Sequence, residues 1–152
     1  MSQSKMFYSQ NKGFWIHEIY MQLVMHYIHQ ELIKTQYNFS NKQDLVDDLE
    51  DNINGICSGY IGLNWEDVIV AGTTEEQTMI SALQNVKTTL QNKGAFISVN
   101  ELQAIATDDW DFKVYYRKPF PTSELIKIID ALIQMLQGTW ASTNYSMHIS
   151  YK

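Results

Sequence analysis

The chain has 152 residues, of which 45% are hydrophobic and 18% are charged, an ordinary composition for one soluble globular domain. Its single cysteine, Cys57, excludes an internal disulfide and a metal cluster built on cysteines. The first residues lack a signal-peptide pattern, and no apolar run reaches the ~18 residues of a membrane span, so we expect a cytoplasmic protein. We expect a single domain over residues 1–152, with residues 1–12 flexible.

The net charge of −6 is concentrated in one segment. Between Gln43 and Val86 the chain has nine acidic residues and no lysine, arginine or histidine, so the remaining chain has a net charge of +3. A negative field of this kind repels nucleic acid and attracts a basic partner. The charge distribution therefore argues against nucleic-acid binding and favours a basic protein as the partner.

Three helices are predicted in the first two thirds of the chain. Residues 14–35 have apolar side chains over about half of the helical circumference, which is typical of a helix buried by neighbours on several sides. Residues 41–61 place apolar side chains on one face and acidic side chains on the other. The third helix is predicted over residues 75–93, where a capping-box pattern precedes the apolar stripe and Gly94 ends it.

The last third of the chain changes its periodicity. Alternation predicts strands over residues 110–117, with Trp110 on the buried face, and over residues 144–151. Residues 123–138 predict an amphipathic helix between them, and residues 95–99 are a further candidate strand. We expect the two longer strands to lie in one sheet, joined by the helix as a crossover. The predicted fold class is α+β, a cluster of three N-terminal helices packed with a small sheet formed by the C-terminal strand-helix-strand unit.

The first predicted helix contains three of the four histidines. The stretch "HEIYM", which begins at His17, starts like a zinc-protease motif, but Met21 stands where that motif needs its second histidine. His17 lies among apolar residues, which is typical of a core histidine. A narrow polar stripe, either solvated or part of a site, is formed by Glu18, Gln22, His26 and His29. Its two histidines supply too few ligands for zinc, so we expect no metal, no cofactor and no catalytic residue.

The acidic side of the second predicted helix is the strongest candidate for a binding surface. It carries Asp44, Asp47, Asp48 and Asp51, with no lysine or arginine between them to offset their repulsion. Such a face either serves solubility or docks lysine and arginine side chains of a partner. Two stretches that combine acids with aromatics are predicted to extend the contact, and they supply Trp65, Glu66 and Asp67, and Asp108 and Asp109. Trp65 is equally compatible with the core, whereas Trp110 is predicted to be a core residue.

In size, acidity, α+β pattern and acid-plus-aromatic stretches, the chain resembles bacterial immunity proteins. That resemblance implies a non-catalytic inhibitor that binds and neutralises a cognate basic toxin domain, often a nuclease. Phage-encoded inhibitors of host defence proteins share this character, and a small acidic secretion chaperone is a further alternative. An enzyme that uses His26 and His29 is the remaining alternative, but the sequence has no phosphate loop, dinucleotide fingerprint or nucleophile-elbow motif.

Overall fold

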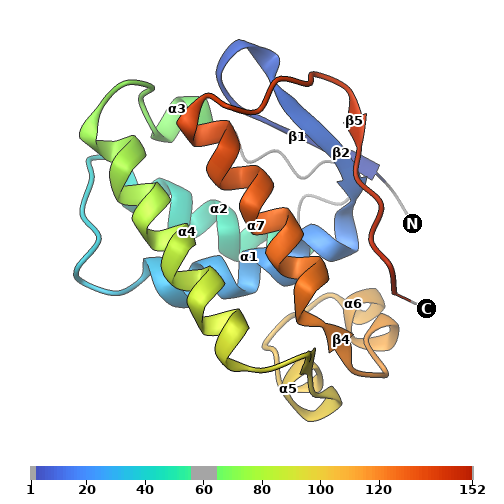
Figure 1. Cartoon of the computed structure of the whole chain (residues 1–152). Coiled ribbons are helices and arrows are strands. Elements are labelled where there is room, and N and C mark those ends of the chain that lie inside the picture. The colour runs from blue at the N-terminus through green and yellow to red at the C-terminus, as the bar shows by residue number, and fades with distance from the viewer. Residues whose placement is uncertain (1–2, 56–64, 152) are drawn as a thin grey trace.

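The computed structural model describes residues 3–55 and 65–151, without the side chains of Glu66 and Asp67. It is an α+β structure, as the sequence predicts (Figure 1). The helices are α1 (Glu18–Leu32), α2 (Lys42–Ile53), α3 (Trp65–Val68), α4 (Thr74–Asn92), α5 (Val99–Gln103), α6 (Trp110–Tyr115) and α7 (Thr122–Gln137). The strands are β1 (Gln3–Phe7), β2 (Gly13–His17), β3 (Phe96–Ile97), β4 (Phe120–Pro121) and β5 (Tyr145–Ser146), and a short 3-10 helix covers Ser9–Asn11.

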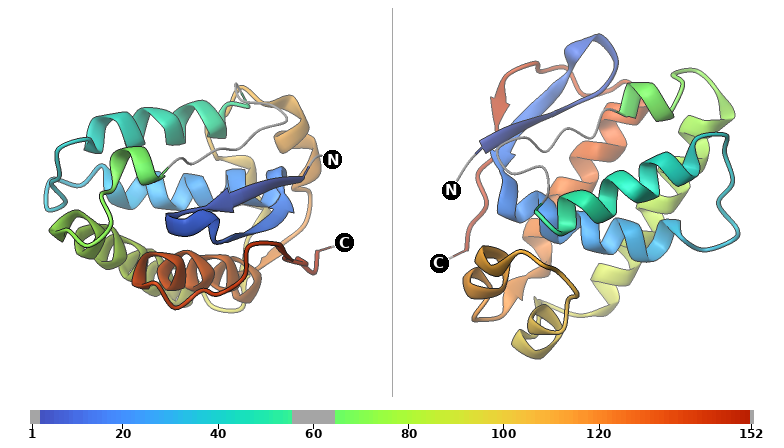
Figure 2. Two further views of the ribbon diagram at one scale, coloured as in Figure 1. Left: turned by 90° about the horizontal axis from the view of Figure 1, so that it is seen from above. Right: turned by 180° about the vertical axis from the view of Figure 1, so that it is seen from behind.

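Helix α1 is the centre of the structure. Helix α2 packs on one side of α1, while α4 and α7 pack on the other side, so α1 lies between two helical layers (Figure 2). Its buried side chains, which include Tyr20, Leu23 and Met25, lie around most of its circumference. The prediction of a helix buried on several sides is therefore confirmed, although the helix begins at Glu18 rather than at residue 14.

Helices α4 and α7 pack against each other to form the second layer. Their buried stripes include Met79, Leu83, Val86 and Leu90 in α4, and Leu125, Ile128, Ile129 and Leu132 in α7. Lys87 Nζ lies 2.8 Å from Asp130 Oδ1, which joins the two helices by an ion pair. Helix α7 ends at Gly138, whose φ of 77° lies in the left-handed region that favours glycine. Both helices are confirmed with their ends shifted by one residue.

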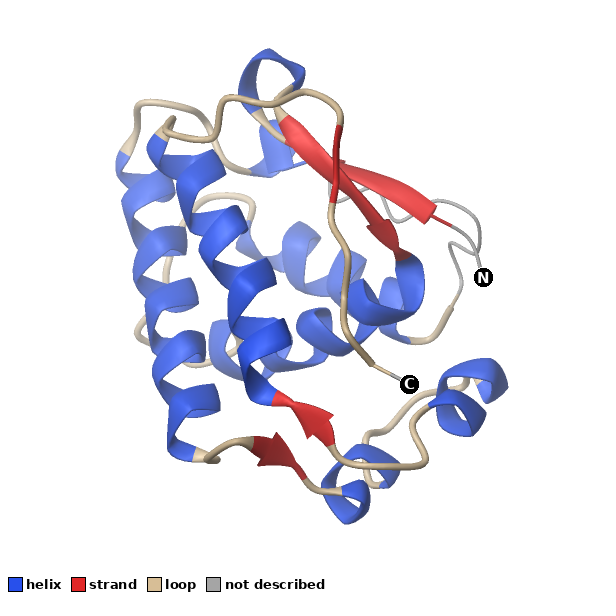
Figure 3. Ribbon diagram, turned by 45° about the vertical axis from the view of Figure 1, so that its right-hand side comes forward, coloured by secondary structure: helices blue, strands red, loops and turns tan. Residues whose placement is uncertain are grey.

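A three-stranded sheet lies at one end of the helical layers (Figure 3). Strand β1 pairs antiparallel with β2, and β2 pairs parallel with β5. Phe14 and Ile16 are buried, whereas Trp15 between them is 40% exposed. Residues 14–17, which we predicted as the start of a helix, therefore alternate as a strand does, and the helical periodicity begins at Glu18.

The N-terminal hairpin differs from the expectation that residues 1–12 are flexible. Strand β1 lies within them, and the side chains of Met6 and Tyr8 are buried. The hairpin also requires glycine at position 13, because a Cβ at Gly13 would lie 1.8 Å from the carbonyl oxygen of Met6. The close approach of the two strands therefore depends on a residue that has no side chain.

Residues 110–117 form helix α6 and its C-terminal turn, so the prediction of a strand is wrong. The buried members of this segment are Phe112 and Tyr116. These residues are four positions apart, so they are in phase with a helix and with a strand. Trp110, which a strand would have buried, is 74% exposed. Asp109 caps the first turn and directs the chain into the helix.

The predicted strand-helix-strand unit does not form one sheet. Strand β5 occupies only part of residues 144–151, and its partner is β2, with Tyr145 opposite Phe14. Strands β3 and β4 form a separate antiparallel pair, which confirms a strand within residues 95–99. The predicted helix 41–61 is confirmed over α2, but α2 ends at Ile53 and residues 54–55 form a turn, so the predicted end is wrong there; residues 56–61 lie outside the described residues. In the described part of the chain, no helix has the length and apolar content needed to cross a membrane.

Candidate functional site

Helix α2 separates apolar and acidic side chains onto two faces. Leu45, Val46 and Leu49 are buried, and α2 packs on α1. The opposite side, which we name the acidic face, is formed by the exposed side chains of Asp44, Asp47, Asp48 and Asp51. The sequence prediction for the position of these four aspartates is therefore confirmed.

The negative charges of the acidic face are not neutralised within the described structure. None of its four carboxylates forms an ion pair with a described residue, whereas Glu31 pairs with Lys34 and Asp130 pairs with Lys87. The neighbouring Glu50 lies 3.6 Å from His29 Nε2. Partial burial, followed by the negative charges of the other three aspartates, raises the pKa of the Asp48 carboxyl. Repulsion between like charges along one side of a helix therefore adds to the effect of burial on this pKa.

The structure brings a second acidic segment to the C-terminal end of α2. Thr107 Oγ1 donates a hydrogen bond of 2.6 Å to the carbonyl oxygen of Ile53. The backbone N–H of Asp108 donates a hydrogen bond of 3.0 Å to Asn54 Oδ1. The two acidic stretches, far apart in the sequence, therefore meet, and Asp108, whose side chain is exposed, lies beside the C-terminal end of α2.

Asp109 has a structural role rather than the predicted role of a partner contact. Its Oδ1 accepts a hydrogen bond of 3.0 Å from the backbone N–H of Asp111, and its Oδ2 accepts one of 2.8 Å from Gln22 Nε2. The half-buried Asp109 thus anchors α6 to α1. Of the two acids that we predicted here as partner contacts, only Asp108 has an exposed side chain.

The two tryptophans near the acidic residues have the opposite positions from those predicted. Trp65 is 1% exposed and belongs to the hydrophobic core, so its prediction as a partner contact is wrong. Trp110 is 74% exposed, so its prediction as a core residue is wrong. Trp110 lines a cavity of about 450 Å³ together with Asp108 and Val114. The side chains of Glu66 and Asp67, also predicted as contacts, lie outside the described residues.

The polar stripe of α1 is more buried than a solvated stripe would be. Gln22 is 6% exposed, and its Nε2 also donates a hydrogen bond of 3.2 Å to the carbonyl oxygen of Asn52. Burial, and then the charge of His29, lowers the pKa of His26 from 6.5 to about 4. His26 is therefore neutral at pH 7. Within residues 3–55 and 65–151, no group of three or more histidine, cysteine, aspartate or glutamate side chains is placed to hold a metal ion.

Aromatic side chains gather where α1 begins. His17 is half-buried, and its ring lies edge-on to that of Tyr20 with centroids 6.3 Å apart. The hydroxyls of Tyr20 and Tyr115 hydrogen-bond to each other, and the Tyr116 hydroxyl donates to the carbonyl oxygen of Ile19 at 2.7 Å. Burial raises the pKa of Tyr20 and of Tyr116. These phenols are therefore neutral at physiological pH and tie α6 to α1.

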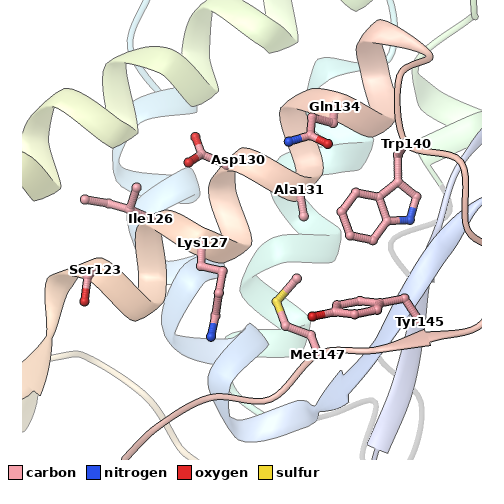
Figure 4. A pocket seen from close by; sticks show the side chains of 9 residues that line it. All are labelled: Ser123, Ile126, Lys127, Asp130, Ala131, Gln134, Trp140, Tyr145 and Met147. Carbon is pink, nitrogen blue, oxygen red and sulfur yellow. The ribbon is translucent and has the colours of Figure 1, made fainter.

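A pocket of about 580 Å³ lies between α7 and the C-terminal segment (Figure 4). Its lining includes Ile126, Ala131 and Gln134 from α7 and Trp140, Tyr145 and Met147 from the C-terminal segment. Trp140 and Tyr145 lie at one end of the pocket in Figure 4. The sequence prediction did not include this pocket, because the space between α7 and the C-terminal segment depends on tertiary packing, which a local pattern does not contain.

The exposure of Trp110 could have been predicted from a helix N-cap pattern in the sequence. The stretch that begins at Asp108 has an aspartate directly before Trp110 and another directly after it. An aspartate before an apolar run is a helix N-cap pattern, and a helix that starts there would place Trp110 opposite Phe112. The aromatic pocket residues Trp140 and Tyr145 had no such signal, because no motif surrounds them.

Comparison of the chain with known protein families, with curated proteins and with solved structures found no match.

Proposed function

We propose that this protein is a non-catalytic inhibitor that binds a basic protein through the acidic face, with Asp108 and Trp110 as neighbouring contacts. The observation that carries the proposal is a set of four exposed aspartates without ion-pair partners among the described residues, on a helix whose other face is fully packed. The packing of α2 on α1 does not use these charges. It uses the buried apolar side chains, the hydrogen bond from Gln22 to the carbonyl oxygen of Asn52 and the contact between Glu50 and His29.

The repulsion among these aspartates has a cost for folding that a partner would relieve. Like charges at i,i+3 and i,i+4 destabilise a helix by ~0.2–0.5 kcal/mol for each pair. Lysine and arginine side chains of a partner would offset this repulsion on binding. Charges of this kind mainly accelerate association and select partners of opposite sign, while less of their effect appears in the dissociation rate.

Trp110 supplies the apolar contact that an acidic surface alone lacks. Tryptophan is strongly enriched among the residues that dominate binding energy at protein interfaces. The exposure of Trp110 is structurally maintained, because Asp109 caps α6 and is itself held by Gln22 of α1. An exposed aromatic side chain on an anchored helix, beside a field of negative charge, fits a partner surface that combines basic and apolar residues.

The partner class that we propose is a toxin domain, and a nuclease is the case that fits best. An enzyme that acts on nucleic acid carries a basic surface to hold the phosphate backbone, and an acidic inhibitor can cover that surface. Such an inhibitor needs no catalytic group of its own. A genomic neighbour encoding a large secreted protein with a variable C-terminal domain would supply the toxin domain to test.

The test measures inhibition of that toxin domain by three forms of this protein. The acidic-face variant carries Asp44→Asn, Asp47→Asn, Asp48→Asn and Asp51→Asn. The charge-matched control carries Ser81→Lys, Gln84→Lys, Thr88→Lys and Gln91→Lys, four exposed positions of α4, and changes the net charge equally. We expect the acidic-face variant to need at least ~10-fold more protein for half-inhibition, which corresponds to ~1.4 kcal/mol, and the control to stay near wild type. Half-inhibition by the acidic-face variant at the wild-type protein concentration would reject the proposal.

A further inference from the structure

The pocket between α7 and the C-terminal segment is separate from the acidic face, because α7 and α2 lie on opposite sides of α1 (Figure 2). Its volume of about 580 Å³ falls in the range of ~300–1,000 Å³ that is usual for small-molecule sites. Ile126, Ala131 and Met147 give it apolar walls. Size and lining therefore match a small molecule better than a protein surface.

The aromatic end of the pocket is held in place before any ligand binds. The indole N–H of Trp140 donates a hydrogen bond of 2.9 Å to the carbonyl oxygen of Gly13. The Trp140 ring also packs edge-on against Phe14 in the core, with centroids 5.8 Å apart, and against Tyr145, with centroids 5.6 Å apart. A rigid aromatic wall lowers the entropy cost of binding, and it favours a flat ligand that stacks or packs edge-on.

The charged side chains of the pocket are already neutralised by neighbours. Lys127 Nζ lies 3.0 Å from Glu124 Oε2 and donates a hydrogen bond of 2.6 Å to the carbonyl oxygen of His148. Asp130 is paired with Lys87 at 2.8 Å. Each charge is therefore already compensated by a protein group of opposite sign, which weakens its attraction for a charged ligand. A charged ligand would give up its hydration for a smaller electrostatic gain than an unpaired charge would offer.

Two polar groups remain available to orient a ligand. The Tyr145 hydroxyl and the side-chain amide of Gln134 have no hydrogen-bond partner among residues 3–55 and 65–151, and both residues line the pocket. The hydroxyl and the amide each donate and accept hydrogen bonds. They would recognise one polar edge on an otherwise apolar molecule.

We propose that this pocket binds a small, uncharged, planar aromatic molecule with one polar edge, independently of the proposed toxin inhibition. Indole is the probe, because it is flat and neutral and has a single N–H donor. Indole-3-acetate and tryptamine are matched probes that carry the same ring with a negative or a positive charge. For a molecule of ~9 non-hydrogen atoms, we expect a dissociation constant of about 0.1 to 5 mM.

The experiment follows backbone amide and indole N–H chemical shifts of the full chain during titration with each probe. We expect saturable shifts at Trp140, Tyr145 and Met147 with indole, and affinities at least ~5-fold weaker for both charged probes. Tyr145→Ala should weaken indole binding ~5-fold or more by removing the aromatic wall, while Tyr145→Phe should keep most of the affinity. The control Phe96→Ala removes an exposed aromatic side chain outside the pocket and should leave the affinity unchanged.

Three results would overturn the proposal. The first is the absence of saturable shifts at the pocket residues with indole. The second is tighter binding of either charged probe than of indole, which would assign the pocket to a charged ligand. The third is unchanged indole affinity in Tyr145→Ala, measured after its amide spectrum has shown that the fold is retained. None of these results bears on inhibition through the acidic face, because the assays and the residues are different.

Discussion

Removal of the charges from the acidic face should stabilise the protein. The change replaces the four aspartates Asp44, Asp47, Asp48 and Asp51 by asparagine, which keeps side-chain size and leaves the buried side of α2 unchanged. The four aspartates form two pairs at i,i+3 and two at i,i+4. At ~0.2–0.5 kcal/mol for each pair, the variant loses about 1 to 2 kcal/mol of repulsion.

One favourable interaction is lost at the same time. Asp44 lies in the first turn of α2, where a negative charge interacts with the helix dipole. This interaction contributes ~0.3–1 kcal/mol at low salt. The hydrogen bond of 2.9 Å from Gln43 Nε2 to Asp47 Oδ1 is kept, because asparagine retains a side-chain oxygen. The expected net gain in the free energy of unfolding is therefore about 0 to 1.7 kcal/mol at low ionic strength.

The assay is urea denaturation at low salt and at 1 M salt, with the unfolding free energy compared between the variant and the wild type. The gain should shrink in 1 M salt, where the screening length falls to ~3 Å. The α4 lysine control introduces like charges on a different helix, so it should lose stability at low salt. A variant that is less stable than the wild type at low salt, or a gain that salt does not reduce, would refute the reasoning.

Three further predictions test the fold directly. Trp65→Ala should lower the unfolding free energy by ~3–5 kcal/mol because it leaves a cavity in the core, whereas Trp110→Ala should change it by less than ~0.5 kcal/mol. Similar costs for the two variants in thermal or urea unfolding would contradict the assigned positions. Burial lowers the pKa of His26 from 6.5 to about 4. The unfolding free energy of the wild type should therefore fall as the pH falls from 6.5 towards 4, because the unfolded state takes up the proton first. In urea titrations at several pH values, the unfolding free energy of His26→Gln should fall less over this range. Gly13→Ala should destabilise the hairpin strongly, because the new Cβ would meet the Met6 carbonyl oxygen at 1.8 Å; an unchanged melting temperature would show that the strands can separate without cost.

The sequence predicts the long helices well because each has a complete local pattern. Helix α7 combines an apolar stripe at helical spacing with a glycine stop at Gly138, and both signals lie within the helix itself. The prediction of a strand over residues 110–117 was wrong for the opposite reason. Phe112 and Tyr116 fit both periods, so the alternation could not decide between helix and strand, and the cap at Asp109 was the decisive feature.

Strand partners could not be predicted from local patterns. Phe14 pairs with Tyr145, and the residues between them contain nearly the whole chain. The alternation of exposed Trp15 and buried Ile16 covers only β2. The apolar residues of the following helix continue directly from it, so the sequence pattern predicted a single helix for both. The pairing depends on tertiary packing, which a periodicity within one segment does not contain.

The candidate site was predictable where it depends on a single helix. The positions of the four aspartates on the exposed side of α2 follow from its apolar stripe. The contact between Asp108 and Asn54 joins two segments through a long-range hydrogen bond, so it could not be predicted. Exposure of Trp110 and burial of Trp65 likewise depend on which elements cover them, and an acidic neighbour is found beside both.

The most direct test of the central proposal is the salt dependence of association between this protein and a basic toxin domain, measured by stopped-flow fluorescence at ~50 mM and ~500 mM salt. If the acidic face steers the partner, the association rate constant of the wild type should fall ~10-fold or more over this range. The acidic-face variant should associate slowly at low salt and respond little to added salt, while the α4 lysine control should retain most of the wild-type dependence. An acidic-face variant with the wild-type rate constant and the wild-type salt dependence would contradict the proposal.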